Sequence, residues 1–126
     1  MPKNVIYSAY APEPIGPYSQ AIQTGNLLFV SGQIAIEKSS GKLLTANIQD
    51  ETHQVMKNLC EILKAASLDF SHIVKTSIFL KDMNNFPAVN EVYGSYFTSQ
   101  PPARETVEVS RLPKDVNVEI SCIAAK

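Results

Sequence analysis

Two charged side chains stand out near the end of this sequence because each lies in a short apolar run. Arg104 lies within residues 103–109, and Glu119 lies between Val118 and Ile120. An arginine in a β pattern is costly to bury unless an anion meets it, and its planar fork fits a carboxylate. The pair therefore predicts a site for a small carboxylate, with the glutamate handling a water molecule or a proton. Spacing alone leaves open a structural Arg–Glu pair, or a solvated Glu119.

Four further residues are candidates for the same site. Tyr18 follows Gly-Pro in a rigid loop, where it could cover a small ligand or simply anchor the loop to the sheet. Ser31 and Gly32 end an apolar strand, and glycine there permits close approach to the backbone, although a β-bulge explains it equally well. Asn90 lies inside a predicted helix, where asparagine is mildly unfavourable unless its amide has a partner.

These residues must be positioned by one domain, residues 1–126, with more strands than helices. Gly25-Asn26 indicates a tight hairpin turn, and Asn47 is a suitable helix cap. The β-branched run at 73–80 is predicted to place Val74, Thr76, Ile78 and Leu80 on one face. The predicted strands are 21–24, 27–31, 33–36, 73–80, 104–109 and 116–124, and the predicted helices are 48–66 and 87–97. This order predicts an α+β fold with one sheet and helices on one face.

The last predicted strand suggests that the other face of the sheet is also covered. Ile120, Cys122 and Ala124 alternate with a second set that includes Ile123, so both faces of this strand carry apolar groups. Since helices cover only one face, an apolar second face favours an oligomer.

Charge and hydropathy exclude several classes of protein. The chain has 11 basic and 12 acidic side chains, a formal net charge of −1, and no basic run, which argues against a non-specific grip on nucleic acid. No apolar run approaches the roughly 20 residues that span a bilayer. The N-terminus lacks the apolar core of a signal peptide, so a cytoplasmic location is expected.

The cysteines and histidines do not have metal-ligand spacing. Cys60 and Cys122 are predicted to be buried free thiols rather than a disulfide. His53 and His72 are expected in surface or capping roles. The sequence contains none of the common phosphate-binding, dinucleotide-binding, zinc-protease or serine-hydrolase motifs.

Several segments, in order and over nearly the whole chain, resemble the Rid family (reactive intermediate deaminases), in particular its RidA subgroup. They are residues 16–21, 30–34, 74–82, 89–93, 102–104, 112–113 and 118–120. The resemblance implies a chorismate mutase-like fold and a homotrimer with active sites between subunits. It implies a 2-iminobutanoate/2-iminopropanoate deaminase, which hydrolyses 2-imino acids and enamines such as 2-aminoacrylate to 2-keto acids and ammonia, without cofactor or metal.

The resemblance also implies roles for individual residues. Arg104 would hold the substrate carboxylate, and Glu119 would hold the hydrolytic water. The remaining substrate-binding residues would be Tyr18, Ser31, Gly32, Asn90 and Thr106.

Two residues depart from the family's pattern. Many relatives have cysteine where Thr106 stands, so a thiol-dependent step at this position is excluded. Glu105 replaces a small residue, but strand alternation points it away from Arg104 and Thr106, so little effect on activity is expected.

Two other functions compete with the deaminase. The same pocket could sense 2-keto acids as a small-acid binding module, but simple capture of a carboxylate does not need Glu119. An RNA-directed inhibitor of translation is the third hypothesis, and the charge of −1 makes it the weakest.

Overall fold

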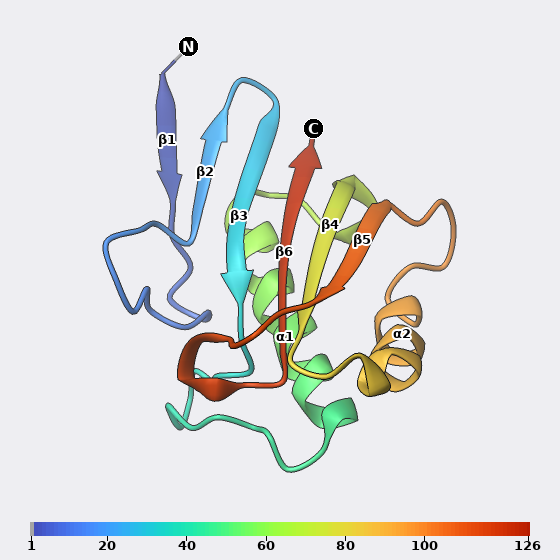
Figure 1. Ribbon diagram of the computed structural model, residues 1–126. Coiled ribbons are helices and arrows are strands. Elements are labelled where there is room, and N and C mark those ends of the chain that lie inside the picture. Colours follow the sequence, from blue (N-terminus) through green and yellow to red (C-terminus); the bar gives the residue numbers. More distant parts are fainter. Residues whose placement is uncertain (1) are drawn as a thin grey trace.

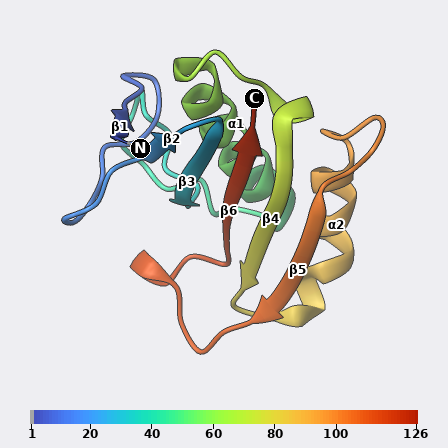
Figure 2. The same ribbon diagram turned by 90° about the horizontal axis from the view of Figure 1, so that it is seen from above.

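One mixed sheet, backed by two helices, forms the computed structural model, which describes residues 2–126 (Figure 1). The strand order is β1-β2-β3-β6-β4-β5, and all neighbours are antiparallel except β4 and β5, which are parallel. The strands are β1 (Lys3–Ile6), β2 (Ala21–Thr24), β3 (Leu27–Gln33), β4 (Ile73–Leu80), β5 (Ala103–Glu108) and β6 (Val118–Ala125). The helices α1 (Ile48–Ala65) and α2 (Phe86–Gly94) lie on the same face of the sheet, as Figure 2 shows from above. The predicted α+β fold is confirmed.

The first half of the sheet confirms one prediction and corrects another. The hairpin of β2 and β3 forms as expected, with Gly25 in the left-handed region at φ 57°. The predicted strand at 33–36 is wrong, because Ile36 makes only an isolated bridge with Leu43. Three strands do precede α1, but the one that the sequence analysis missed is β1, which pairs with β2 at the edge of the sheet. Its residues are mostly exposed, so no alternation of apolar and polar residues marked it in the sequence.

Both predicted helices exist, although the second is shorter than expected. Asn47 caps α1 by accepting a hydrogen bond of 2.8 Å from the Asp50 amide. Helix α2 ends at Gly94 and not at Phe97, because the next amides bond three residues back, in tightened turns. Tyr96 and Phe97 still pack against the core, which explains why the apolar stripe extends beyond the helix.

The main core lies between the helices and the sheet. Ile78 and Leu80 are buried on the inner face of β4, as predicted. Val74 was predicted to join them but is 48% exposed. The pairing of β4 with β6 shifts register between Ile73 and Lys75, so Ile73 takes the inner position instead.

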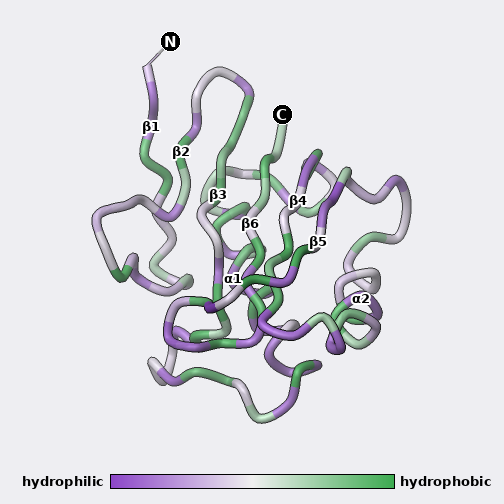
Figure 3. The backbone as a smooth tube through the Cα atoms, viewed as in Figure 1, coloured by the Kyte–Doolittle hydropathy of each residue, from purple (hydrophilic) through white to green (hydrophobic). Residues whose placement is uncertain are grey.

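In the part of the chain that the structure describes, no helix covers the opposite face of the sheet, and apolar side chains remain exposed there. Phe29 on β3 is 43% exposed and Val107 on β5 is 41% exposed. Strand β3 is hydrophobic over its first four residues and strand β6 over most of its second half (Figure 3). Among residues 2–126, no helix is long and apolar enough to cross a membrane.

The structure confirms the free thiols and the capping role of His72. Cys60, which was predicted to be buried, is only partly buried, and His53 is partly buried instead of lying at the surface. Cys60 and Cys122 are free. His72 accepts a hydrogen bond from the Asp69 amide and so closes the cap of a short 3-10 turn, while His53 bonds to the hydroxyl of Tyr96 at 2.7 Å. In the described part of the chain, no group of three or more His, Cys, Asp or Glu side chains is arranged to hold a metal ion.

Candidate functional site

The predicted site residues separate into two groups on opposite faces of the sheet. Arg104 on β5 pairs with Thr76 of β4, whose side chain is buried beneath the helices. Glu119 on β6 pairs with Phe79, three residues further along β4, and therefore points to the face that no helix covers. We call Tyr18, Ser31, Gly32 and Glu119 the glutamate half, and Asn90, Arg104 and Thr106 the arginine half.

The glutamate half surrounds an open cavity of about 320 Å³. Two loops, residues 7–20 and 109–117, meet the ends of β3 and β6 there. The lining residues are Ile15, Tyr18, Ser31, Gly32, Ile34, Pro113 and Glu119. Apolar side chains thus form most of the wall, and Glu119 contributes the one charged group among the lining residues.

Gly32 is required by the position of Glu119. A Cβ atom at Gly32 would lie 2.8 Å from Cδ and 2.9 Å from Oε2 of the Glu119 carboxyl group. The sequence analysis predicted that Gly32 permits close approach to the backbone of the strand. In the structure the group that approaches is the side chain of Glu119. The register shift between Val30 and Gln33 lies at the same point, so the predicted bulge is also present.

The Glu119 carboxyl group is half-buried and has no hydrogen-bond or ion-pair partner among residues 2–126. Burial raises its pKa above the ordinary value of 4.5, and no neighbouring cation opposes this effect. A carboxylate left in this state is a stronger base than a solvated one, and it has free oxygens for a water molecule. Neither a cross-strand pair nor full solvation, the structural alternatives for Glu119, describes its position.

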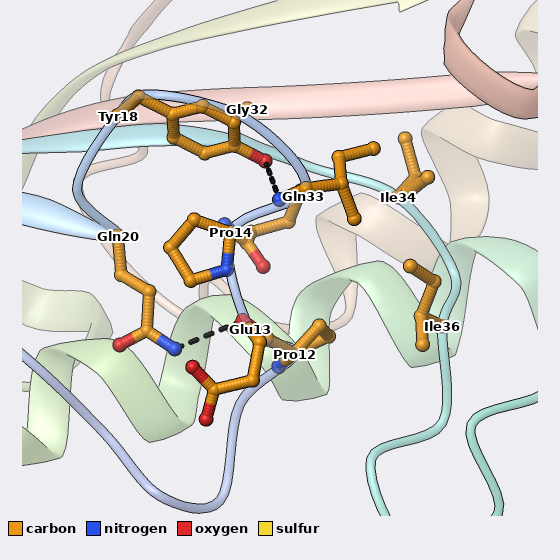
Figure 4. Close-up of a pocket in the computed structure, with 10 residues that line it drawn as sticks. Pro12, Glu13, Pro14, Tyr18, Gln20, Gly32, Gln33, Ile34 and Ile36 are labelled. Atoms are coloured by element: carbon orange, nitrogen blue, oxygen red, sulfur yellow. Dashed lines mark hydrogen bonds between the residues drawn. The ribbon is translucent and has the colours of Figure 1, made fainter.

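Tyr18 and Ser31 hold the Pro-rich loop in place. The Tyr18 hydroxyl accepts a hydrogen bond of 3.2 Å from the Ile15 amide, which is the dashed line at Tyr18 in Figure 4. Tyr18 is 46% exposed and lines the cavity beside Glu119. The Ser31 hydroxyl donates to the Ser19 carbonyl at 2.7 Å. Tyr18 is therefore both an anchor of its loop and part of the cavity wall.

Gln20 supports the same loop, and the sequence analysis missed it. Its buried side chain accepts from the Ser8 amide at 2.7 Å and donates to the Ser8 and Pro12 carbonyls at 3.1 and 2.9 Å (Figure 4 shows the bond to Pro12). A long polar side chain directly before an apolar strand needs such partners, and this was the signal available.

In the arginine half, helix α2 presents three residues to Arg104. The Asn90 amide oxygen accepts a hydrogen bond of 2.7 Å from Nη1 of Arg104, which gives Asn90 the partner that its helical position predicted. The guanidinium carbon lies 5.6 Å from the ring centre of Phe86 and 5.1 Å from that of Tyr93. Arg104 is thus held by one hydrogen bond and two aromatic rings.

Thr106 and Glu105 differ in their surroundings. The Thr106 hydroxyl oxygen is covered and is the one buried side-chain polar atom of the described residues without a hydrogen-bond partner. Glu105 points to the opposite face, where it accepts from Ser77 at 2.6 Å and pairs with Lys75 at 3.0 Å. Those two contacts, Ser77 first, lower the pKa of Glu105. As predicted, Glu105 does not compete for Arg104.

The chain is similar to many known proteins over its whole length. The model of the family described as Endoribonuclease L-PSP matches residues 8–126. A RutC family protein of Pyrococcus horikoshii is 52% identical over 98% of both chains. The 2-iminobutanoate/2-iminopropanoate deaminase of Homo sapiens is 46% identical over 97% of this chain and 89% of its own. The crystal structure of E. coli TdcF with bound serine has a TM-score of 0.94 and 38% identity, over 98% of both chains.

Proposed function

Because this chain belongs to the Endoribonuclease L-PSP family and has relatives named as deaminases, we propose that it hydrolyses 2-imino acids to 2-keto acids and ammonia. The predicted resemblance to the Rid family is thereby confirmed. The proposed substrates are 2-iminopropanoate, 2-iminobutanoate and 2-aminoacrylate. The observation that carries the proposal is the unpartnered, half-buried carboxylate of Glu119 in a cavity with apolar walls.

The proposed reaction needs little from the protein. The carbon of a protonated imine is already electrophilic, so a water molecule can attack it once both are held in line. Glu119 takes a proton from the attacking water, which gives a tetrahedral amino alcohol, and then passes this proton to the amino nitrogen. Ammonia leaves as the C–N bond breaks, and the hydroxyl group loses its remaining proton as its oxygen becomes the keto oxygen. Arg104 binds the substrate carboxylate through its two-pronged donor edge and keeps that charge paired throughout.

The cavity wall supports a preference for uncharged substrate side chains. Ile15, Ile34 and Pro113 offer apolar contacts, while Glu119 is the only charged lining residue and would repel a second substrate carboxylate. Short alkyl groups, as in the proposed substrates, fit this chemistry.

The proposed site is shared between two copies of the chain. Within one chain Arg104 and Glu119 point to opposite faces of the sheet, so a small molecule cannot touch both. The exposed apolar face, with Phe29 and Val107, provides a surface on which another copy can pack. A closed homotrimer, in which the substrate lies between Arg104 of one subunit and Glu119 of the next, satisfies both features.

A coupled assay tests the activity. A threonine dehydratase would generate 2-iminobutanoate in the presence of semicarbazide, which traps the free imine. The wild type is expected to speed keto-acid formation and suppress the semicarbazone. Arg104→Ala should lose this effect, at a cost of about 2–5 kcal/mol in transition-state binding. Arg111→Ala, which removes an exposed arginine that pairs with Asp115, is the control and should remain active.

Mixing inactive variants tests the shared site. Arg104→Ala and Glu119→Gln subunits, unfolded and refolded together, should recover about a quarter of wild-type activity, since random assortment restores that fraction of sites. No recovery in mixed oligomers would show that one chain supplies both residues. Binding of 2-oxobutanoate without turnover by the wild type would favour the small-acid binding module instead.

A further inference from the structure

Tyr93 contacts Arg104 in the arginine half, but neither the sequence analysis nor the proposed reaction gives it a role. Its ring centre lies 5.1 Å from the guanidinium carbon of Arg104, and Phe86 lies at 5.6 Å. Phe86, Asn90 and Tyr93 recur at helical spacing, so α2 turns one face toward Arg104. Asn90 accepts one hydrogen bond from Nη1, and the guanidinium carbon lies over both rings.

The Tyr93 side chain is held in place by a hydrogen bond at its hydroxyl group and by packing of its ring. Its hydroxyl shares a hydrogen bond of 2.7 Å with Thr76, and its ring packs against Phe97 with centres 4.8 Å apart. Tyr93 is only 4% exposed. Thr76 is also the residue of β4 that pairs with Arg104 in the sheet. The strand that sets the position of the Arg104 backbone thus also sets the position of the ring that meets its side chain.

The contact between Tyr93 and Arg104 involves a neutral ring. Burial raises the pKa of the Tyr93 hydroxyl above 10, although the Thr76 hydrogen bond and the charge of Arg104 act in the other direction. Tyr93 is therefore not a counter-ion, and Arg104 keeps its full charge for an external anion. Contact with the ring faces restricts the plane of the guanidinium group, which otherwise rotates freely on a long side chain.

We propose that Tyr93 is a positioning residue, which, anchored on Thr76, orients the guanidinium group of Arg104 so that its free edge meets the carboxylate of the substrate. This proposal rests on the proposed function, because it assumes that Arg104 binds a carboxylate. Tyr93 touches Arg104 and not the substrate. Its effect should therefore appear in binding more than in the chemical step.

The test measures the affinity for 2-oxobutanoate, the stable keto-acid product of 2-iminobutanoate hydrolysis, together with KM and kcat. Tyr93→Leu, which removes the ring, should weaken binding about fivefold and raise KM with a smaller change in kcat. Tyr93→Phe keeps the ring and should rescue most of the affinity. Tyr96→Leu is the matched control, since Tyr96 contacts His53 and Phe70 instead of Arg104.

A spectroscopic readout separates orientation from general loss of structure. The guanidinium group of Arg104 has its central carbon over two aromatic rings, so its protons should show a ring-current shift that Tyr93→Leu reduces and Tyr96→Leu leaves unchanged. Phe86→Leu gives a second, less buried variant in case Tyr93→Leu does not fold. If folded Tyr93→Leu matched the wild type in affinity, KM and this shift, the positioning role would be wrong while the deaminase activity stood.

The remaining outcomes are also decisive. A wild type that binds 2-oxobutanoate but hydrolyses no imine would overturn the proposed function, whereas a selective loss of affinity in Tyr93→Leu would still support the positioning role. A wild type that binds no carboxylate would overturn both.

Discussion

The two halves of the site treat their charged groups in opposite ways. Arg104 is held by a hydrogen bond from its guanidinium group to Asn90 and by the rings of Phe86 and Tyr93. Glu119 has no such partner in the described part of the chain. Its position is set by steric fit, because its carboxyl group occupies the space that the missing side chain of Gly32 leaves. A group that binds an anion benefits from a fixed orientation. A group that takes a proton benefits from an uncompensated charge, since pairing would lower its basicity.

The largest effect should come from removing that uncompensated charge. Glu119→Gln keeps the shape of the side chain but cannot accept a proton, and we expect kcat to fall about 10²–10⁴-fold. The measurement is keto-acid formation in the coupled assay. A loss of less than tenfold would mean that Glu119 only positions the water molecule. The uncompensated charge of Glu119 would then have no catalytic role to set against the fixed orientation of Arg104.

The role of shape is tested at Gly32. In Gly32→Ala the new Cβ would lie 2.8 Å from Cδ of Glu119, so the carboxyl group must move, and we expect kcat/KM to fall about ten- to a hundredfold. Gly94→Ala is the matched control, because a Cβ there meets nothing within 4 Å. Equal activity of both variants would show that the carboxyl group tolerates displacement.

The raised pKa of Glu119 predicts a pH dependence for both activity and stability. Activity needs the ionised form, so kcat/KM should fall with decreasing pH at a midpoint above 4.5, and Glu119→Gln should lack this limb. Since the folded protein binds this proton more tightly than the unfolded chain does, the free energy of unfolding decreases as pH rises from the unfolded to the folded pKa.

Thermal unfolding at several pH values measures the stability side of this prediction. At neutral pH, Glu119→Gln should melt at a higher temperature than the wild type, and the difference should disappear below pH 4. A variant less stable at neutral pH would indicate that the carboxylate has a favourable partner in the assembled protein.

Thr106 offers a smaller effect in the arginine half. Thr106→Val replaces a covered hydroxyl that has no partner in the described chain, and we expect stability to rise by about 1 kcal/mol. Chemical denaturation measures this change. If stability did not rise and kcat/KM fell instead, the predicted role of Thr106 in substrate binding would be supported, with the hydroxyl partnered by substrate or by another subunit.

The smallest effect on activity is expected at Glu105. Its carboxylate bonds to Ser77 and Lys75 on the face away from Arg104, so Glu105→Ala should leave kcat/KM within about twofold of the wild type. A large loss of kcat/KM in this variant would mean that contacts on the face opposite the helices affect the function of the arginine half.

Local patterns were sufficient for most of the elements. The hairpin at Gly25, the cap at Asn47 and the run of β4 each depend on neighbouring residues, and each is present in the structure. The errors lie where tertiary contacts decide. Strand β1 exists because β2 offers it a partner, and Val74 turns outward because a register shift intervenes.

The sequence by itself determined the chemistry that is available: an arginine and a glutamate in apolar strands, a glycine before the end of β3, and the neighbours of Arg104 on its own strand. The tertiary structure decided how these groups are distributed. The face to which a strand residue points depends on pairing register, and a shift of one residue reverses it. The registers of β5 and β6 against β4 therefore place Arg104 beneath α2 and Glu119 on the uncovered face. The contact between Gly32 and Glu119 likewise exists only because β3 and β6, distant in sequence, are neighbours in the sheet.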